Sequence, residues 1–132
     1  MTDVPAGFGD PTTAPFWEAA ADRRLIVQRC TACGAFQFYP RPFCLECDAA
    51  ELEWAPVAGT GTVYAMTTVH LSVDPALEPP YVVAVVDLDE GPRLLTNLVG
   101  APAAIGDRVS VAWRERDGAP PLPVFEAGGG AA

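Results

Sequence analysis

Cys30-Thr31-Ala32-Cys33 and Cys44-Leu45-Glu46-Cys47 are the stretches that decide the fold, and they hold all four cysteines of the chain. Two residues between cysteines let both sulfurs point inward from one tight turn, and two such knuckles face to face make a tetrahedral thiolate cage. Gly34 follows the first pair, where a knuckle often needs the positive φ that glycine adopts at little cost. The spacing predicts a compact structural zinc ribbon with Cys30, Cys33, Cys44 and Cys47 as metal ligands and no open position for catalysis.

Four cysteines have three other common uses. Two disulfides require an oxidising compartment, and the first seven residues have neither the basic nor the apolar region of a secretion signal. A redox dithiol fits two symmetric pairs less well than a metal does. Iron in a rubredoxin-like site uses the same four ligands, so the sequence leaves zinc and iron open.

The composition is that expected of an acidic cytoplasmic protein. The chain has 132 residues, half of them hydrophobic, which suffices for one ordinary domain or two small ones. No apolar run approaches the ~20 residues of a membrane span, so no membrane association is expected. The formal net charge of −9 repels phosphate backbones, so no nucleic-acid partner is expected either.

The basic residues are unevenly placed along the chain. All eight are arginines, and Arg23, Arg24, Arg29 and Arg41 lie within residues 23–47, where only one acid occurs. Guanidinium groups bind phosphates and carboxylates in a bidentate manner, so this group of arginines is a candidate for binding a phosphate or a carboxylate. Pairing with the protein's own abundant acids is the simpler alternative.

Residues 1–24 are predicted to form an extended arm and then a short docking helix. Phe16, Ala19 and Ala20 share one helix face at i, i+3, i+4 spacing, with Trp17 at its edge. So short a helix is marginal alone, and its aromatic side chains must pack against its own ribbon, the default, or against another subunit.

Residues 25–57 are predicted to be the ribbon. Strands are expected at 25–29, leading into the first knuckle, at 35–39, ending at prolines, and at 52–57, leaving the ribbon. Such a unit buries too little apolar surface to fold alone, so metal binding must supply folding energy on the order of 10 kcal/mol or more.

Residues 58–127 are predicted to form a small closed barrel, followed by a flexible tail over 128–132. Its five strands are expected at 62–70, 81–88, 93–99, 108–114 and 122–125, where β-branched or alternating residues occur. Closure removes unpaired sheet edges, and a long first strand with glycine-rich corners favours an OB-type barrel. A five-stranded SH3-like barrel is the main alternative.

The sequence contains no evident catalytic set. It lacks a Gly-x-Ser-x-Gly elbow and a P-loop, and its one histidine, His70, has no obvious nucleophile beside it. Asp87, Asp89 and Glu90 fit a solvated hairpin turn better than a cation site. With the cysteines committed to metal, the sequence favours a binding or scaffolding module whose partner performs the chemistry.

Several motifs, in their order along the chain, resemble one known family. They are Pro15-Phe16-Trp17-Glu18-Ala19-Ala20, Arg24-Leu25-Ile26-Val27-Gln28-Arg29-Cys30, Cys33-Gly34, Tyr39-Pro40-Arg41, Cys44-x-x-Cys47, Trp54, Gly59-x-Gly61-x-Val63-Tyr64, the run from Pro80 to Leu88, Glu90-Gly91-Pro92-Arg93 and Ile105-Gly106-Asp107-x-Val109. The family is that of the acyl-CoA-associated OB-fold proteins with a rubredoxin-like zinc ribbon, long known as a domain of unknown function. The resemblance covers residues 14–126.

The resemblance implies a mainly β architecture: a short N-terminal helix, a four-cysteine zinc ribbon and a five-stranded OB-fold barrel. It also implies partners, because members accompany or are fused to thiolase-like enzymes and hydratases that act on acyl-CoA thioesters. Some bridge a thiolase and a second acyl-CoA enzyme, and others pair with lipid-transfer-type aldolases in steroid side-chain degradation. The lysine-free, Ala- and Pro-rich composition is typical of a GC-rich genome and favours the second group.

We therefore expect a non-catalytic accessory subunit that forms a hetero-oligomer with a thiolase-like acyl-CoA enzyme, above all a retro-aldolase of steroid side-chain degradation. Two alternatives stay open: a CoA or acyl-CoA binding module that bridges two enzymes, and a single-stranded nucleic-acid-binding OB protein, which the net charge disfavours. The expected partner or CoA contacts are Phe16, Trp17, Arg24, Arg29 and Arg41.

Overall fold

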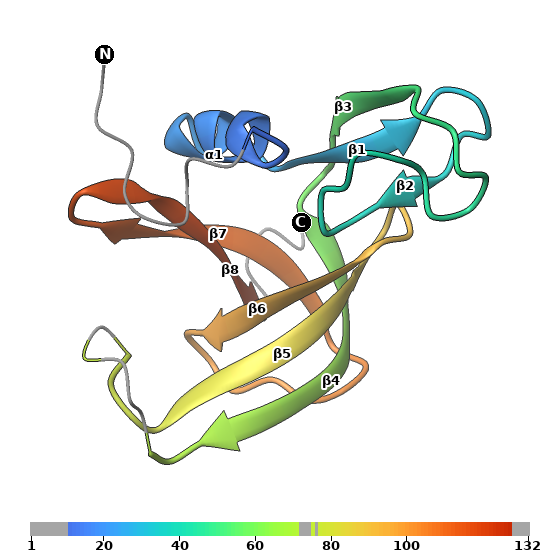
Figure 1. Cartoon of the computed structure of the whole chain (residues 1–132). Helices are drawn as coiled ribbons and strands as arrows, with labels where there is room; N and C mark the ends of the chain where they lie inside the picture. Colours follow the sequence, from blue (N-terminus) through green and yellow to red (C-terminus); the bar gives the residue numbers. More distant parts are fainter. Residues whose placement is uncertain (1–10, 72–74, 76, 128–132) are drawn as a thin grey trace.

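The computed structural model describes residues 11–71, 75 and 77–127. In this part of the chain, one helix and a three-stranded sheet stand beside a closed five-stranded barrel (Figure 1). Residues 1–10 of the expected arm and the expected tail over 128–132 lie outside the described residues. No helix in the described part is long and apolar enough to cross a membrane.

The helix α1 spans Ala14–Ala21, and its buried face consists of Phe16, Ala19 and Ala20, as the i, i+3, i+4 spacing predicts. Its N-cap residue, Thr13, makes no side-chain capping hydrogen bond. The buried face packs against the barrel strand β8 (Ala119–Ala127) as well as against the ribbon. The expectation that the helix packs against its own ribbon was therefore incomplete, because the same apolar face also packs against the barrel.

The ribbon contains a small antiparallel sheet with the order β2-β1-β3. Strand β1 spans Ile26–Cys30, β2 Phe36–Gln37 and β3 Leu52–Pro56. Gln28 of β1 lies opposite Gln37 of β2 and Trp54 of β3. The second strand is shorter than the predicted 35–39, because the chain leaves the sheet after Gln37 towards the prolines before the second knuckle.

The barrel closes in the order β4-β5-β6-β8-β7, with β4 paired to β7. Its other strands are β4 (Thr60–Val69), β5 (Tyr81–Leu88), β6 (Arg93–Val99) and β7 (Arg108–Arg116). The predicted bounds of β5 and β6 are confirmed. The last strand lies between β6 and β7 and runs parallel to β6, which is the Greek-key arrangement expected of an OB-type barrel.

Strand β8 differs most from the prediction. The last strand was expected at residues 122–125, yet β8 begins at Ala119 and includes Pro120 and Pro121. The prolines are tolerated because β8 pairs with β6 only at Phe125 and Glu126, so the start of β8 has one free edge. Proline is compatible with such an edge because its missing N–H is not needed there.

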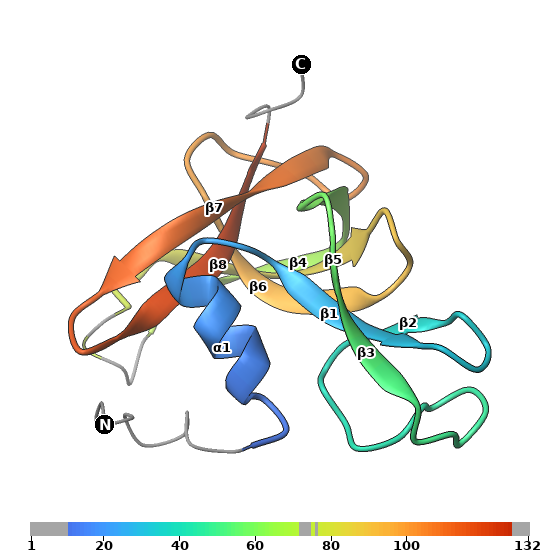
Figure 2. The same ribbon diagram turned by 90° about the horizontal axis from the view of Figure 1, so that it is seen from above.

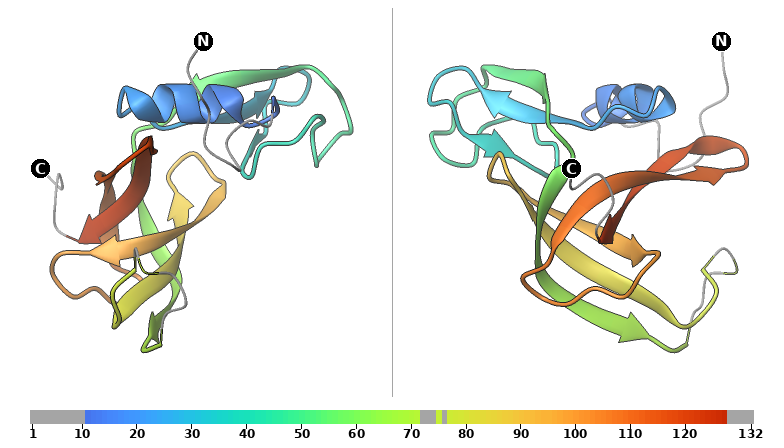
Figure 3. Two further views of the ribbon diagram at one scale, coloured as in Figure 1. Left: turned by 60° about the vertical axis from the view of Figure 1, so that its left-hand side comes forward. Right: turned by 180° about the vertical axis from the view of Figure 1, so that it is seen from behind.

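A single apolar core joins the helix, the ribbon and the barrel. Phe16 of the helix and Val27 of β1 belong to the same buried cluster as Val86 and Phe125 of the barrel. Figure 2 shows α1 lying over β8, and Figure 3 shows the helix and ribbon as one layer across the barrel. The ribbon therefore gains from the barrel the apolar contacts that it is too small to supply itself.

Candidate functional site

The four cysteine sulfurs meet at one point of the ribbon. All four Sγ atoms lie within 4.8 Å of one another, with 3.6 Å between Cys30 and Cys47 and 3.6 Å between Cys33 and Cys44. A tetrahedral site with Zn–S bonds of about 2.3 Å places its sulfurs about 3.8 Å apart, so the cluster has the size of a zinc cage. All four cysteines are free, which sets the disulfide alternative aside.

The two knuckles share one backbone design. The N–H of Gly34 donates to the carbonyl of Cys30 at 2.8 Å, and the N–H of Asp48 donates to the carbonyl of Cys44 at 2.9 Å. Gly34 has a φ of 81°, as predicted, and Asp48 has the equivalent role with a φ of 63°. The sequence did not single out Asp48, although aspartate is among the few residues other than glycine that visit this region readily.

The thiols do not share one pKa. The backbone N–H of Cys33 donates to Cys30 Sγ at 3.4 Å, and this hydrogen bond outweighs burial and lowers the pKa of Cys30 to about 7. At Cys47 the backbone N–H of Ala49 acts to lower the pKa, but the neighbouring thiols, Cys30 first, and burial raise the pKa to about 12. A metal ion bound here displaces the remaining protons, because only thiolates coordinate.

Two buried glutamines hold the loop that leads to the second knuckle. Gln28 Nε2 donates to the carbonyl of Arg41 at 2.8 Å, and Gln28 Oε1 accepts from the N–H of Arg41 at 2.8 Å. Gln37 Nε2 donates to Gln28 Oε1 at 2.9 Å and to the carbonyl of Phe43 at 3.1 Å. Gln37 Oε1 accepts from the N–H of Leu45 at 3.0 Å. The side chains that hold the loop leading to Cys44 are therefore amides, which sequence analysis missed.

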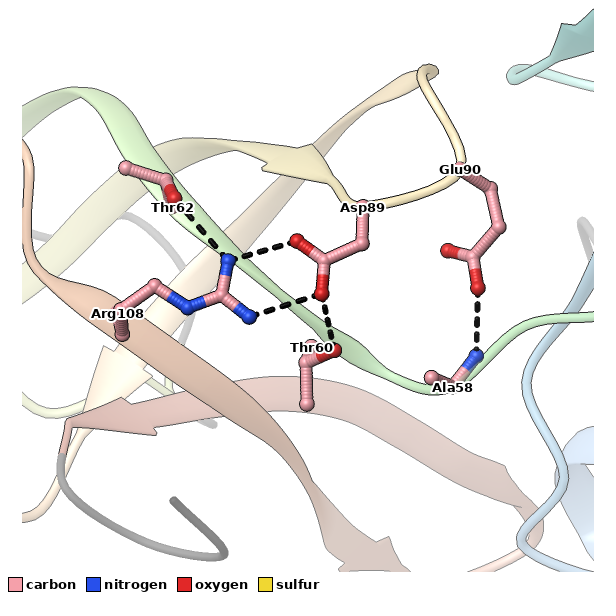
Figure 4. Close-up of polar contacts among 6 residues, drawn as sticks. All are labelled: Ala58, Thr60, Thr62, Asp89, Glu90 and Arg108. Carbon is pink, nitrogen blue, oxygen red and sulfur yellow. Dashed lines mark hydrogen bonds and ion pairs between the residues drawn. The ribbon is translucent and has the colours of Figure 1, made fainter. Parts of the chain in front are cut away.

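A polar network fixes the junction of ribbon and barrel (Figure 4). Glu90 Oε2 accepts from the N–H of Ala58 at 2.9 Å. The Asp89 carboxylate accepts from both terminal nitrogens of Arg108 at 2.6 and 2.8 Å and from Thr60 Oγ1 at 2.6 Å. The hydrogen bonds from Arg108, and then that from Thr60, hold the pKa of Asp89 well below its usual range. Of the two acids predicted to form a solvated turn, Glu90 therefore holds the turn to Ala58, between the ribbon and the barrel, and Asp89 holds it to the barrel strands β4 and β7.

The candidate aromatic contacts differ in accessibility. Phe16 is 4% exposed and belongs to the core, so its expected contact with a partner is corrected to a structural role within this chain. Trp17 is half-buried and meets the Phe16 ring edge-on, with 4.9 Å between ring centroids. Trp17 therefore keeps more surface for a partner than Phe16 does.

The candidate arginines are also unequal. Arg29 pairs with Glu53 at 3.1 Å, as the simpler alternative of pairing within the chain expected. Arg24 is exposed, and its contact with Asp22 is a long 4.0 Å. Arg41 is exposed too, and its backbone rather than its charge is used by the glutamine network. Within the described residues, Arg24 and Arg41 are thus the candidate arginines whose side chains interact most weakly with the rest of this chain.

Comparison with protein-family models covers most of the chain. Residues 17–53 match the model described as "ChsH2, rubredoxin-like zinc ribbon domain", and residues 54–114 match "ChsH2, C-terminal OB-fold domain". The chain belongs to this family. The OB-fold match sets the SH3-like alternative aside, and the ribbon match agrees with a metal site at the four cysteines.

A solved structure named "Ltp2-ChsH2(DUF35) aldolase" contains a chain with the same fold. The TM-score is 0.82 at 43% sequence identity, covering 89% of this chain and 95% of that one. A "DUF35 domain-containing scaffold protein" of Methanothermobacter thermautotrophicus is 30% identical over 78% of this chain and 82% of its own length. Relatives of nearly the same extent are thus named as a scaffold protein and as part of an aldolase.

Other relatives are longer proteins that include a segment of this kind. A "Probable enoyl-CoA hydratase alpha subunit" of Thermomonospora curvata is 48% identical over 83% of this chain and 36% of its own length. The "3-oxo-4,17-pregnadiene-20-carboxyl-CoA hydratase alpha subunit" of Mycobacterium tuberculosis is 33% identical over 70% of this chain and 29% of its own length. The chain therefore spans about a third of the length of these two relatives.

Proposed function

We propose that the chain is a zinc-containing, non-catalytic accessory subunit that binds and completes a thiolase-like acyl-CoA enzyme in the cytoplasm. The enzyme we propose is a retro-aldolase that acts on a steroid side chain carried as a CoA thioester. The observation that carries the proposal is the 43% identity, over nearly the whole of both chains, to the DUF35 chain of an aldolase. The name of the M. tuberculosis relative supports the steroid-CoA class of substrate.

The proposed metal is zinc, and its role is structural. Four cysteines fill a tetrahedral coordination sphere, so the ion has no open position for substrate. The sulfur spacing, the paired positive-φ residues and the glutamine network all fit such a closed cage. Iron is the other ion that this ligand set suits, and metal analysis of the purified protein distinguishes the two.

The non-catalytic role rests on how the reactive side chains of the described part are used. The cysteines form the proposed metal cage, Asp89 is held by Arg108, and Asp87 pairs with Arg93 at 2.7 Å. A rigid barrel placed over one side of a partner's active site would shape the substrate pocket and exclude water, which assists catalysis without supplying a reacting group.

The test is reconstitution with a defined enzyme, the Ltp2 polypeptide of the solved aldolase. We expect Ltp2 to form a stable complex with this chain and to gain retro-aldol cleavage of a steroid-CoA substrate, while this chain alone has none. A matched Cys44→Ser variant, which lacks one ligand, should lose both the metal and the complex. Full turnover by this chain alone, or an Ltp2 rate that this chain leaves unchanged, refutes the proposal.

A further inference from the structure

The barrel wall formed by β4, β5 and β6 is apolar on its outside as well as on its inside. Along β5, Ala84, Val86 and Leu88 are buried in the barrel, so Val83 and Val85 between them point outward. Val85 is flanked by Ala65 of β4 and Leu95 of β6. The three strands run next to one another in Figure 1, and the strand registers place Ala65, Val85 and Leu95 in one row across them.

An apolar outer wall is unusual in an antiparallel barrel. The outward face of such a sheet is ordinarily polar, because it meets water. Here Leu95 is 70% exposed, and the neighbouring row across the strands, Thr67, Val83 and Asn97, is uncharged as well. Contiguous apolar surface of this kind marks a contact site rather than a solvated one.

The apolar wall continues into a hollow beside the helix and the ribbon. The hollow has a volume of about 430 Å³, and its lining includes Trp17, Phe38, Tyr39 and Leu122. Val83 and Leu95 line both this hollow and a shallow groove of about 220 Å³ on the wall itself. The helix, the metal ribbon and the barrel thus each contribute to one continuous apolar surface.

We propose that this surface, the outer β4–β6 wall with its hollow, is where the partner enzyme subunit docks, and that the partner inserts an apolar side chain into the hollow. The inference rests on the proposed function and adds the face that carries it. Interfaces between different proteins characteristically have a core poor in charge and a polar rim, and apolar or aromatic anchors in pockets dominate their energetics.

The charge of this chain favours a different protein, rather than a second copy of the chain, as the partner that covers the apolar wall. Two copies would each bring a formal net charge of −9 to the contact, and like charge opposes association. At one end of the wall, Arg93 pairs with Asp87 at 2.7 Å and lies over the Tyr64 ring at 3.6 Å from its centroid. This neutralised pair forms a polar rim beside the uncharged centre.

The metal ribbon has a defined part in this surface. Tyr39 lies between β2 and the loop held by the two glutamines, is half exposed, and forms one wall of the hollow. Loss of the metal would release the knuckles and with them this wall, while the barrel strands kept their pairing. A structural ion in the ribbon therefore acts on docking through the shape of the hollow.

The experiment measures binding of Ltp2 to the wild-type chain and to single variants by biolayer interferometry. Leu95→Asp puts a charge at the centre of the wall on a side chain that is already exposed, so it should leave the fold intact. We expect it to weaken Ltp2 binding at least about 100-fold, mainly through faster dissociation. Ile105→Asp makes the same change at another exposed position outside the wall, and we expect its affinity to stay within about twofold of wild type.

The outcomes separate the inference from the proposed function. Failure of the wild-type chain to bind Ltp2 refutes the proposed function and, with it, the occupant named here. Wild-type binding that Leu95→Asp leaves unchanged refutes the docking face alone. A wild-type dimer in sedimentation that Leu95→Asp dissociates would assign the wall to a second copy. Calorimetric binding of octanoyl-CoA that Leu95→Asp abolishes, with Ltp2 binding kept, would assign the hollow to a ligand; either result overturns the inference.

Discussion

Replacement of Gly61 by alanine tests how closely the first two barrel strands approach each other. Gly61 lies opposite Leu88 in the β4–β5 pair. A Cβ atom at this position would lie 2.3 Å from the carbonyl oxygen of Asp87 and 2.8 Å from Val86 Cγ1, where ordinary contacts begin at 3.4 Å. The carbonyl belongs to a paired strand and cannot rotate away, so the strands themselves must separate.

The size of the effect follows from this geometry. Overpacking a well-ordered site costs about 1–3 kcal/mol, and the clash with backbone places Gly61→Ala at the upper end, about 3 kcal/mol. An unfolding entropy of about 2.1 cal/mol/K per residue gives about 0.28 kcal/mol/K for a chain of 132 residues. The melting temperature should therefore fall by about 11 °C.

The assay is thermal unfolding followed by circular dichroism at saturating zinc, with Gly118→Ala as the matched control. Gly118 has a φ of +70° and no neighbour within 4 Å of an added Cβ, so its substitution costs only the left-handed conformation, about 1–2 kcal/mol. We expect about 4–7 °C for the control. A melting temperature for Gly61→Ala within about 2 °C of wild type would refute the close approach of β4 and β5.

Three further predictions concern the metal site, its support and the junction. Cys44→Ala leaves three ligands, and we expect bound zinc, measured by mass spectrometry, to fall from one equivalent to a small fraction. Gln28→Ala leaves buried partners of the glutamine network unpaired, which should cost about 2 kcal/mol in urea unfolding; a loss below about 0.5 kcal/mol would contradict this. The contacts with Arg108 and Thr60 lower the pKa of Asp89 in the folded protein, so they stabilise the fold at pH values above the pKa of an unfolded aspartate, about 3.9. This stabilisation is lost as the pH falls through that value towards the pKa of the folded state. Asp89→Asn should therefore be less stable than wild type by about 1 kcal/mol at pH 7, with the difference shrinking below about pH 4; a difference independent of pH would argue against the ion pair with Arg108.

Local patterns in the sequence were sufficient for the elements that depend on neighbouring residues. The two Cys-x-x-Cys pairs predicted that the four cysteine sulfurs come together, and Gly34 predicted the backbone turn of the first knuckle. The bounds of β5 and β6 follow from an apolar run that ends at a Gly-Pro turn. These features can be predicted from the sequence because each depends on residues within about ten positions of one another.

Features that depend on distant contacts were missed. The sequence predicted that α1 packs on its own ribbon, as the default, or on another subunit, and missed the barrel strand β8, because the spacing of apolar residues does not show which surface covers them. The sequence analysis did not single out Gln28 and Gln37, since these two residues face each other only when β1 and β2 pair. The sequence predicted too late a start for β8, because Pro120 and Pro121 fit a strand only where one of its edges is unpaired.

The contact between α1 and β8 has a consequence for biosynthesis. The helix leaves the ribosome before the ribbon and the barrel, yet the surface that buries Phe16 includes a strand that ends at Ala127. Phe16 therefore gains its full contacts only after β8 has been translated, whereas both knuckles are complete once Asp48 has been translated and can bind the proposed zinc ion much earlier. The concentration of available zinc during translation should therefore determine how long the thiols and backbone of the nascent ribbon stay accessible to oxidants and proteases.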